Sequence, residues 1–250
     1  MIRPIPLRHN SHMTPVRMKL AQKEFDSGGG FEVTFARISV KVQNLAFAKD
    51  VAVHYTPDNV NWKDSPLPWN SPSFGNYDIF AGTVNEQVEQ FVIRYSVNGE
   101  TFWDNNNGQN YNFTGNLTTV GGNVVLNKAT ARQGTEAGGG FTFTTSWLEG
   151  EILVNNFGFS KSVGIVLSVD GGTNWTVTQA NFTGTATADG QFVGPAEVWT
   201  FKTPELNLNP ASNAFLFAAF YRDLASGKEF WDNNFGQNYQ LSKTNGTVID

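Results

Sequence analysis

Residues 102–111 read FWDNNNGQNY, and residues 230–239 read FWDNNFGQNY. The two stretches differ only where Phe235 stands in place of Asn107. Each stretch closes a segment of about 100 residues, which is an ordinary size for a domain. A repeat of this length at domain spacing indicates that the chain contains the same domain twice.

The segments upstream of the two blocks also align. Residues 40–49 read VKVQNLAFAK, and residues 152–161 read ILVNNFGFSK. An alternating apolar stretch follows in each copy, and after it comes a polar turn that ends in a tryptophan, Trp62 in the first copy and Trp175 in the second. Three matching elements in the same order support a duplicated domain.

The duplication predicts a first module at residues 16–117 and a second at residues 124–243. Residues 1–15 mix Pro, Arg and His and lack the apolar core of a signal peptide, so we interpret them as a leader or linker. A Gly-Gly pair within residues 116–123 favours a hinge, and this stretch is predicted to link the modules.

The local pattern predicts β-strands throughout. Apolar and polar side chains alternate at residues 51–55 (VAVHY) and 91–95 (FVIRY). Clusters of Gly, Asn, Asp and Pro punctuate such stretches, and helical periodicity is missing. Short strands with frequent turns predict an all-β chain of two tandem antiparallel β-sandwich domains.

Composition narrows the classes of function. The 250-residue chain contains no cysteine, which excludes disulfides, a thiolate nucleophile and a cysteine-based zinc site. The net charge is -5 without a basic stripe, so no nucleic-acid partner is expected. No apolar run is long enough to cross a bilayer, so no membrane partner is expected either. Aromatic residues make up 14% and asparagine is abundant, which suits a neutral, hydroxyl-rich ligand.

The motifs above resemble those of family 21 carbohydrate-binding modules, the starch- and glycogen-binding kind. The first copy has Asn-Leu-Ala-Phe at residues 44–47, a turn that ends at Trp62, and the Trp-Asp-Asn-Asn block at residues 103–106. Both copies match, so the resemblance covers nearly all of residues 16–243. It implies that each sandwich is immunoglobulin-like and that the ligand is an α-glucan. No cofactor and no metal ion are expected.

The resemblance also implies which residues bind. The family's main site uses the tryptophan of the turn, the aromatic residue before Asp-Asn-Asn and the neighbouring asparagines. These are Trp62, Trp103, Asn105, Asn106 and Asn110 in the first copy, and Trp175, Trp231, Asn233, Asn234 and Asn238 in the second. A weaker second site is implied at Phe47 and Phe159. A third aromatic residue of the main site is missing, because Val92 and Ala218 occupy its positions.

These residue types suit a sugar. An indole ring can lie against the C–H face of a pyranose while the hydroxyl groups stay in water. Asparagine both donates and accepts hydrogen bonds and costs less to desolvate than a charge. Two linked modules raise avidity by roughly 10² to 10⁴ where one polymer reaches both.

Several residues of the repeat also have a structural interpretation. Asp104 and Asp232 are expected to accept hydrogen bonds within their turns and not to contact the ligand. Tyr111 and Tyr239 are predicted to be half-buried supports. His54, alone on a strand, is interpreted as a surface residue.

The chain is not expected to be an enzyme. A glycosidase needs two carboxylates across a cleft, and the repeated acids Asp104 and Asp232 lie in different modules. Two alternatives stay open for the function. The same platform could bind a β-glucan or an algal polysaccharide, or the chain could be a glycogen-targeting scaffold for a protein phosphatase. The nearest match to a phosphatase-docking motif is residues 33–35 (VTF), which follow Glu32 where a basic residue is needed.

The predicted partner is a polysaccharide, a glucan, bound by a monomer. We expect the chain to work beside, or to be a region of, a polysaccharide-degrading enzyme with a linked catalytic domain. Five Asn-x-Ser/Thr sequons occur, one of them at Asn174 directly before Trp175. A glycan there would obstruct the tryptophan, which favours an extracellular or cell-surface protein of bacterial origin.

Overall fold

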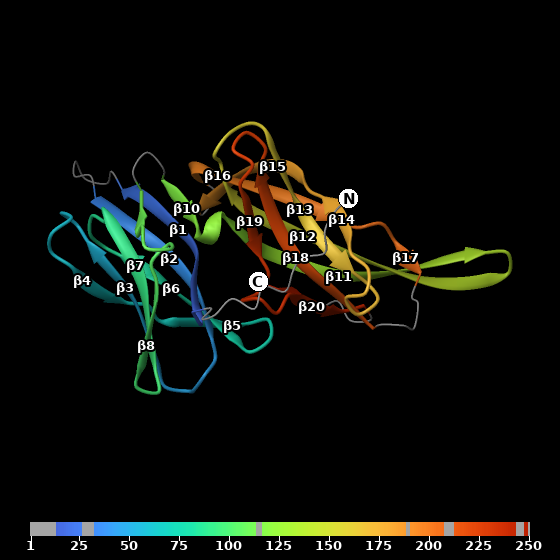
Figure 1. Cartoon of the computed structure of the whole chain (residues 1–250), viewed down its shortest axis with the longest axis horizontal. Helices are drawn as coiled ribbons and strands as arrows, with labels where there is room; N and C mark the ends of the chain where they lie inside the picture. Colours follow the sequence, from blue (N-terminus) through green and yellow to red (C-terminus); the bar gives the residue numbers. More distant parts are fainter. Residues whose placement is uncertain are drawn as a thin grey trace. The chain divides into compact units, whose positions relative to one another are not determined.

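A computed structural model of the chain describes residues 14–26, 33–113, 117–188, 191–207, 213–243 and 248–249 (Figure 1). The chain divides into two compact units, the first containing residues 14–123 and the second most of the chain from Val124 onward. Most of the predicted leader lies outside the described residues. No helix in the described ranges has the length and apolar character needed to cross a membrane.

The first module is a sandwich of two antiparallel sheets. The first sheet has the order β10-β1-β2-β6-β5, with β1 (Val16–Asp26), β2 (Val33–Gln43), β5 (Trp69–Ser73), β6 (Tyr77–Val84) and β10 (Thr118–Val120). The second sheet has the order β4-β3-β7-β8, and β9 pairs with β7; its strands are β3 (Lys49–Thr56), β4 (Lys63–Pro66), β7 (Gln90–Val97), β8 (Glu100–Asp104) and β9 (Tyr111–Asn112).

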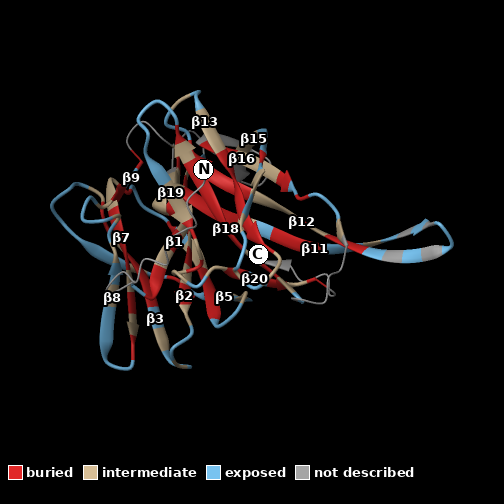
Figure 2. Ribbon diagram, turned by 45° about the vertical axis from the view of Figure 1, so that its right-hand side comes forward, coloured by how far each residue is buried: buried red, intermediate tan, exposed pale blue. Residues whose placement is uncertain are grey.

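The alternation read from the sequence explains the core of this module. Val51, Val53 and Tyr55 of β3 point inward, as do the alternate residues Phe91 and Ile93 of β7, and all are buried. Figure 2 shows these strands as largely buried, with exposed segments at the turns. Burial of each side chain of this size stabilises the folded module by about 1.5–3 kcal/mol. The alternate side chains of the same strands point outward, so these positions can carry polar groups.

The second module repeats this order strand for strand. One sheet runs β15-β16-β12-β11-β21, with β17 paired to β12, and the other runs β14-β13-β18-β19, with β20 paired to β18. The bounds are β11 (Val124–Gly138), β12 (Phe141–Asn155), β13 (Lys161–Ser168), β14 (Thr176–Gln179), β15 (Asn181–Ala188), β16 (Gln191–Lys202), β17 (Leu206–Asn207), β18 (Ala214–Asp223), β19 (Glu229–Asp232), β20 (Tyr239–Ser242) and β21 (Val248–Ile249). The predicted all-β class with two tandem antiparallel sandwiches is confirmed.

One hairpin distinguishes the second module. Strands β11 and β12 pair over their whole length, and the far end of their hairpin is largely exposed (Figure 2). The turn consists of Gly139 and Gly140, with φ of 61° and 83°. Two successive positive φ angles are what a tight hairpin turn requires, and glycine adopts them without strain.

The prediction that residues 116–123 link the modules is wrong for residues 118–123. Thr118–Val120 form β10, whose Leu20↔Val120 pairing places it beside β1 in the first module. The 3₁₀ turn Gly121–Asn123 follows directly. A Cβ on Gly121 would lie 1.7 Å from the carbonyl oxygen of Met18, so this glycine allows a close backbone approach and does not serve as a hinge.

Candidate functional site

An aspartate shapes the turn that presents Trp62. The carboxylate of Asp58 accepts hydrogen bonds from the backbone N–H of Asn61 (2.7 Å) and Val60 (2.9 Å) and from the side-chain amide of Asn61 (2.6 Å). These bonds, with the Asn61 backbone as the largest cause, hold the pKa of Asp58 well below its ordinary value. The ionised carboxylate therefore fixes the turn, and Trp62 follows it.

The second module builds the corresponding turn with Asp170. Its carboxylate accepts from the backbone N–H of Asn174 (2.9 Å), from the Asn174 amide (2.7 Å) and from Ser168 Oγ (2.8 Å). The bonds from Asn174 are the main cause that lowers the pKa of Asp170 to about 2. Trp175 Nε1 donates to the carbonyl oxygen of Gly172 at 3.0 Å, so this indole is also fastened to its own turn.

An aspartate that bonds to a buried tyrosine anchors each repeated block. Asp104 accepts from the backbone N–H of Met18 (2.6 Å) and from Tyr111 Oη (2.9 Å). Asp232 accepts from the N–H of Leu126 (2.8 Å) and from Tyr239 Oη (3.0 Å). The prediction that these acids accept hydrogen bonds is confirmed.

The predicted half-burial of the two tyrosines is wrong, because both rings lie in the core. Phe91 stacks on Tyr111 with ring centroids 5.3 Å apart, and Phe217 stacks on Tyr239 at 5.6 Å. Burial, followed by the neighbouring charge of Asp104, raises the pKa of Tyr111 well above its ordinary value. The tyrosines therefore join the loop to the core and do not face the ligand.

Several asparagines of the block have backbone reasons for being there. Asn106, Asn107 and Asn110 have φ of 52°, 57° and 54°, and Asn234 and Asn238 have φ of 51° and 59°. Asparagine tolerates this left-handed region better than other non-glycine residues. The repeated asparagines therefore encode the path of the loop as well as offering amides.

The amides of the block are partly used within the loop. Asn106 Nδ2 donates to the carbonyl of Asn110 at 3.1 Å, and Asn105 Oδ1 accepts from the N–H of Gly108 at 3.0 Å. In the second module Asn233 Oδ1 accepts from the N–H of Gly236 at 2.9 Å. Asn234 is only 5% exposed, and its Nδ2 donates to the carbonyl of Asn238 at 3.3 Å.

The structure brings Trp62 and Trp103 together on one sheet face through His54. The His54 ring stacks on Trp62 with centroids 4.9 Å apart and planes at 16°, and it meets the edge of Trp103 at 5.5 Å. Trp62 is 38% and Trp103 40% exposed. His54 was interpreted from the sequence as a surface residue, and its place between the two indoles was missed.

Hydrogen bonds also tie the turn of the first module to its repeated block. Gln90 Nε2 donates to Asn59 Oδ1 at 2.8 Å, and Gln90 Oε1 accepts from Asn110 Nδ2 at 3.1 Å. Asn59 lies in the turn that precedes Trp62, and Asn110 follows Trp103. Asn110 therefore orients the loop, and the two bonds through Gln90 connect the turn before Trp62 to the block that contains Trp103.

The second module brings Trp175 and Trp231 together in a different way. Both indoles pack against a buried apolar cluster of Val166, Ala218 and Phe220. The rings of Phe220 and Trp231 lie 5.7 Å apart at 46°. Both tryptophans are consequently half-buried.

Phe47 and Phe159 are fully exposed, so neither ring packs in the core. A buried cation supports each loop. Lys49 Nζ pairs with Asp78 at 2.7 Å and donates to the carbonyl of Ala46 at 2.9 Å, while Lys161 Nζ pairs with Glu197 at 2.8 Å. Both rings are accessible to a ligand.

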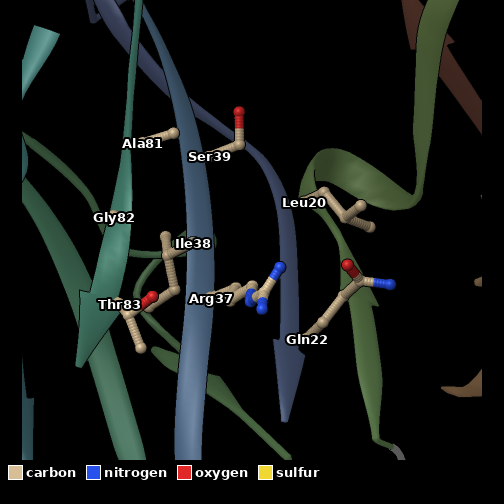
Figure 3. A pocket seen from close by; sticks show the side chains of 8 residues that line it. All are labelled: Leu20, Gln22, Arg37, Ile38, Ser39, Ala81, Gly82 and Thr83. Carbon is tan, nitrogen blue, oxygen red and sulfur yellow. The ribbon is translucent and has the colours of Figure 1, made fainter. Parts of the chain in front are cut away.

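A hollow of about 290 Å³ lies on the other sheet of the first module, over β1, β2 and β6 (Figure 3). Gln22, Arg37 and Ser39 are among the side chains that line it. None of its lining residues is aromatic, so it has no surface on which a sugar ring could stack. None of the predicted site residues lines it.

Comparison with known proteins identifies the family. The family described as "Carbohydrate/starch-binding module (family 21)" matches residues 35–114 and 138–242. The chain therefore belongs to this family and contains its module twice.

Two of the relatives are proteins of different kinds, a glucoamylase and a regulatory subunit of a protein phosphatase. Glucoamylase 1 of Rhizopus oryzae is 34% identical over 79 residues, which are 29% of this chain and 13% of that protein. Protein phosphatase 1 regulatory subunit 3B of Homo sapiens is 35% identical over 85 residues, which are 29% of each chain. The match thus spans less than a third of either relative.

Two solved structures are similar in sequence. One is the starch-binding domain of Rhizopus oryzae glucoamylase in complex with β-cyclodextrin and maltoheptaose (25% identity, 41% of this chain, 95% of that chain, TM-score 0.31). The other is the carbohydrate-binding module of the muscle glycogen-targeting subunit of protein phosphatase-1 (26% identity, 45% of this chain, 74% of that chain, TM-score 0.27).

Proposed function

We propose that the chain binds an α-glucan, starch or glycogen, and does not cleave it. The observation that carries this proposal is the pair Trp62 and Trp103, held on one sheet face by contact with His54 and each more than a third exposed. Membership of the family of carbohydrate/starch-binding modules supports a carbohydrate as the ligand.

Binding follows from stacking and hydrogen bonding together. The two indoles offer flat apolar faces for the C–H faces of sugar units along one chain. Asn105, exposed at the start of the block, lies two residues from Trp103 and offers an amide to the sugar hydroxyls. The second module contributes Trp175 and Trp231, so a polymer that reaches both modules gains avidity.

The acids of the repeated blocks support a role without catalysis. A glycosidase requires a general acid and a second carboxylate across a cleft. Asp104 and Asp232 instead accept backbone and tyrosine hydrogen bonds that hold the loops. Any hydrolysis would belong to a linked or neighbouring enzyme, which is part of this proposal, as is an extracellular or cell-surface location in a bacterium.

The phosphatase-targeting alternative has less support. Residues 33–35 lie in β2, where Val33 pairs with Asp26 and Phe35 with Glu24 of β1. A short docking peptide has to offer its backbone as an added strand or extended segment. Here the pairing with β1 already occupies one edge of that backbone.

Affinity gel electrophoresis tests the function. The wild type and Trp62→Ala/Trp175→Ala are run through gels that contain soluble starch, glycogen, laminarin or an algal galactan. We expect starch and glycogen to retard the wild type, and the double variant to migrate freely. Trp147→Ala, a change on β12 outside the platforms, serves as the control and should be retarded normally. Retardation only by laminarin or the galactan would reassign the ligand, and retardation by none of the four would reject glucan binding.

A further inference from the structure

Four charged or titratable side chains lie on the same sheet face as the platform of the first module. We call Asp50, His54, Asp64 and Arg94 the charged strip. Arg94 Nη1 pairs with Asp50 at 2.9 Å and Arg94 Nη2 pairs with Asp64 at 3.0 Å, while His54 Nδ1 lies 2.6 Å from Asp64 Oδ1. All four side chains are partly exposed.

Strand register explains why the charged strip adjoins both tryptophans. His54 pairs with Asp64 on one side, and Arg94 pairs with Trp103 on the other. Since residues that face each other across strands share one face of a sheet, the strip continues the surface on which the indoles lie. His54 belongs to both, because it stacks on Trp62 and bonds to Asp64.

The second module has no such strip at the same register. Val166 pairs with Val177, as His54 pairs with Asp64. Phe220 pairs with Trp231, as Arg94 pairs with Trp103. At these positions the tryptophans therefore lie beside charged side chains in the first module and apolar ones in the second, where the ion pair of Arg222 with Glu229 lies farther along the same face.

Stability gives little reason for the charged strip. Partly exposed ion pairs contribute little to stability, and the second module folds the same face with Val166, Val177 and Phe220 in the places of His54, Asp64 and Arg94. Carboxylates and a guanidinium fixed in place are, by contrast, strong partners for hydroxyl groups, because hydrogen bonds to charged groups are stronger than those between neutral groups. The mutual pairing of the strip fixes its geometry before a ligand arrives.

We propose that the charged strip is the hydrogen-bonding half of the sugar site in the first module. Asp50 and Asp64 accept from sugar hydroxyls while the indoles stack on the ring faces, so the first module selects its glucan by hydroxyl pattern. This inference rests on the proposed carbohydrate-binding function.

Isothermal titration of the full chain with two cyclic glucans tests the proposal. β-Cyclodextrin offers hydroxyl donors, and its 2,6-di-O-methyl derivative keeps the ring faces but lacks the donors at the methylated positions. We compare the ratio of the two affinities in the wild type, in Asp50→Asn/Asp64→Asn and in the control Ser39→Ala, which lies on β2 in the other sheet of the module. Steric effects of the methyl groups are common to all three proteins and cancel between them.

We expect the first site of the wild type to prefer unmodified β-cyclodextrin about tenfold or more, since one charged hydrogen bond corresponds to about that factor. The Asp50→Asn/Asp64→Asn variant should reduce the preference to less than about threefold, mainly by weaker binding of β-cyclodextrin, and Ser39→Ala should keep it. An unchanged ratio in the aspartate variant, or an equal loss for both ligands, would overturn the role of the strip.

A separate variant distinguishes this failure from failure of the platform. Trp62→Ala/Trp103→Ala removes both indoles of the first module and leaves the aspartates in place. It should abolish the first site for both cyclodextrins. If its binding equals that of the wild type, the proposed platform is wrong, and the strip proposal falls with it.

Discussion

The two modules have equivalent loops, but the sheet faces below these loops carry different side chains. Both repeated blocks are anchored by an aspartate that accepts from a core tyrosine and from a backbone N–H of the first strand of the module. In the first module the indoles lie beside His54 and the charged strip. In the second they rest on Val166, Ala218 and Phe220.

This difference shows that an almost identical motif can lead to two unlike surfaces. The motif residues determine the path of the loop, since they supply left-handed asparagines and the aspartate that anchors the loop. The chemical character of the surface depends on residues outside the motif. These residues lie on β3, β4 and β7 in the first module and on β13, β14 and β18 in the second. Trp175 and Trp231, which are half-buried, therefore contribute to the packing of their module as well as presenting part of their rings, whereas Trp62 and Trp103 contact the ring of His54.

The largest expected effect concerns the shared anchor. Asp232→Ala should destabilise the second module by about 3 kcal/mol, because it leaves a buried tyrosine hydroxyl and a backbone N–H without an acceptor. Asp104→Ala should have a smaller effect, about 2 kcal/mol, since Asp104 is less buried. Urea unfolding followed by tryptophan fluorescence measures both. Tyr239→Phe removes one hydroxyl alone and should cost about 1 kcal/mol; an equal effect for Asp232→Ala would contradict the anchor.

The tryptophans should separate binding from stability. Trp231→Ala removes a ring packed on an apolar cluster and should destabilise its module by about 2 kcal/mol. Trp103→Ala should destabilise by less than about 1 kcal/mol while weakening retardation by starch more strongly. Thermal unfolding and affinity electrophoresis of the two variants give both values. Equal losses of stability would show that the faces are equivalent after all.

A strained residue distinguishes the two blocks. Phe235 has φ of 56°, a left-handed conformation that is an outlier for a bulky residue, where the first module has Asn107. Phe235→Asn should stabilise the second module by about 1 kcal/mol, and Asn107→Phe should destabilise the first by a similar amount. Denaturant unfolding tests the pair. Destabilisation by Phe235→Asn would mean that contacts of the phenyl ring outweigh the backbone strain.

The smallest effect concerns pH. The pKa of Asp170 in the folded chain is about 2, below the value of about 3.9 for an unperturbed aspartate. A depressed pKa contributes stability that is present above the unfolded value and is lost as the pH falls through the folded value. The turn of Trp175 should therefore loosen between about pH 4 and pH 2, seen as a change in tryptophan fluorescence. Asp170→Asn should lose this dependence; an unchanged profile would reject the role of the carboxylate.

Much of the fold could be predicted from the sequence because its signals are local. The repeat revealed the duplication, and period-two alternation in residues 51–55 and 91–95 predicted inward faces that the structure confirms. The tryptophans of the site were found because a motif carries them. His54 was missed because one histidine on a strand carries no periodic signal.

The sequence by itself determined that the chain is two all-β modules with a tryptophan in each turn and each block. Only the tertiary structure decided what lies beside those tryptophans, how deep the tyrosines sit and that Thr118–Val120 is a strand. The physical reason is that strand register brings together residues far apart in the chain. The ring of His54 meets that of Trp103 across β7, which lies between their strands, and Leu20 pairs with Val120; no local pattern records either contact.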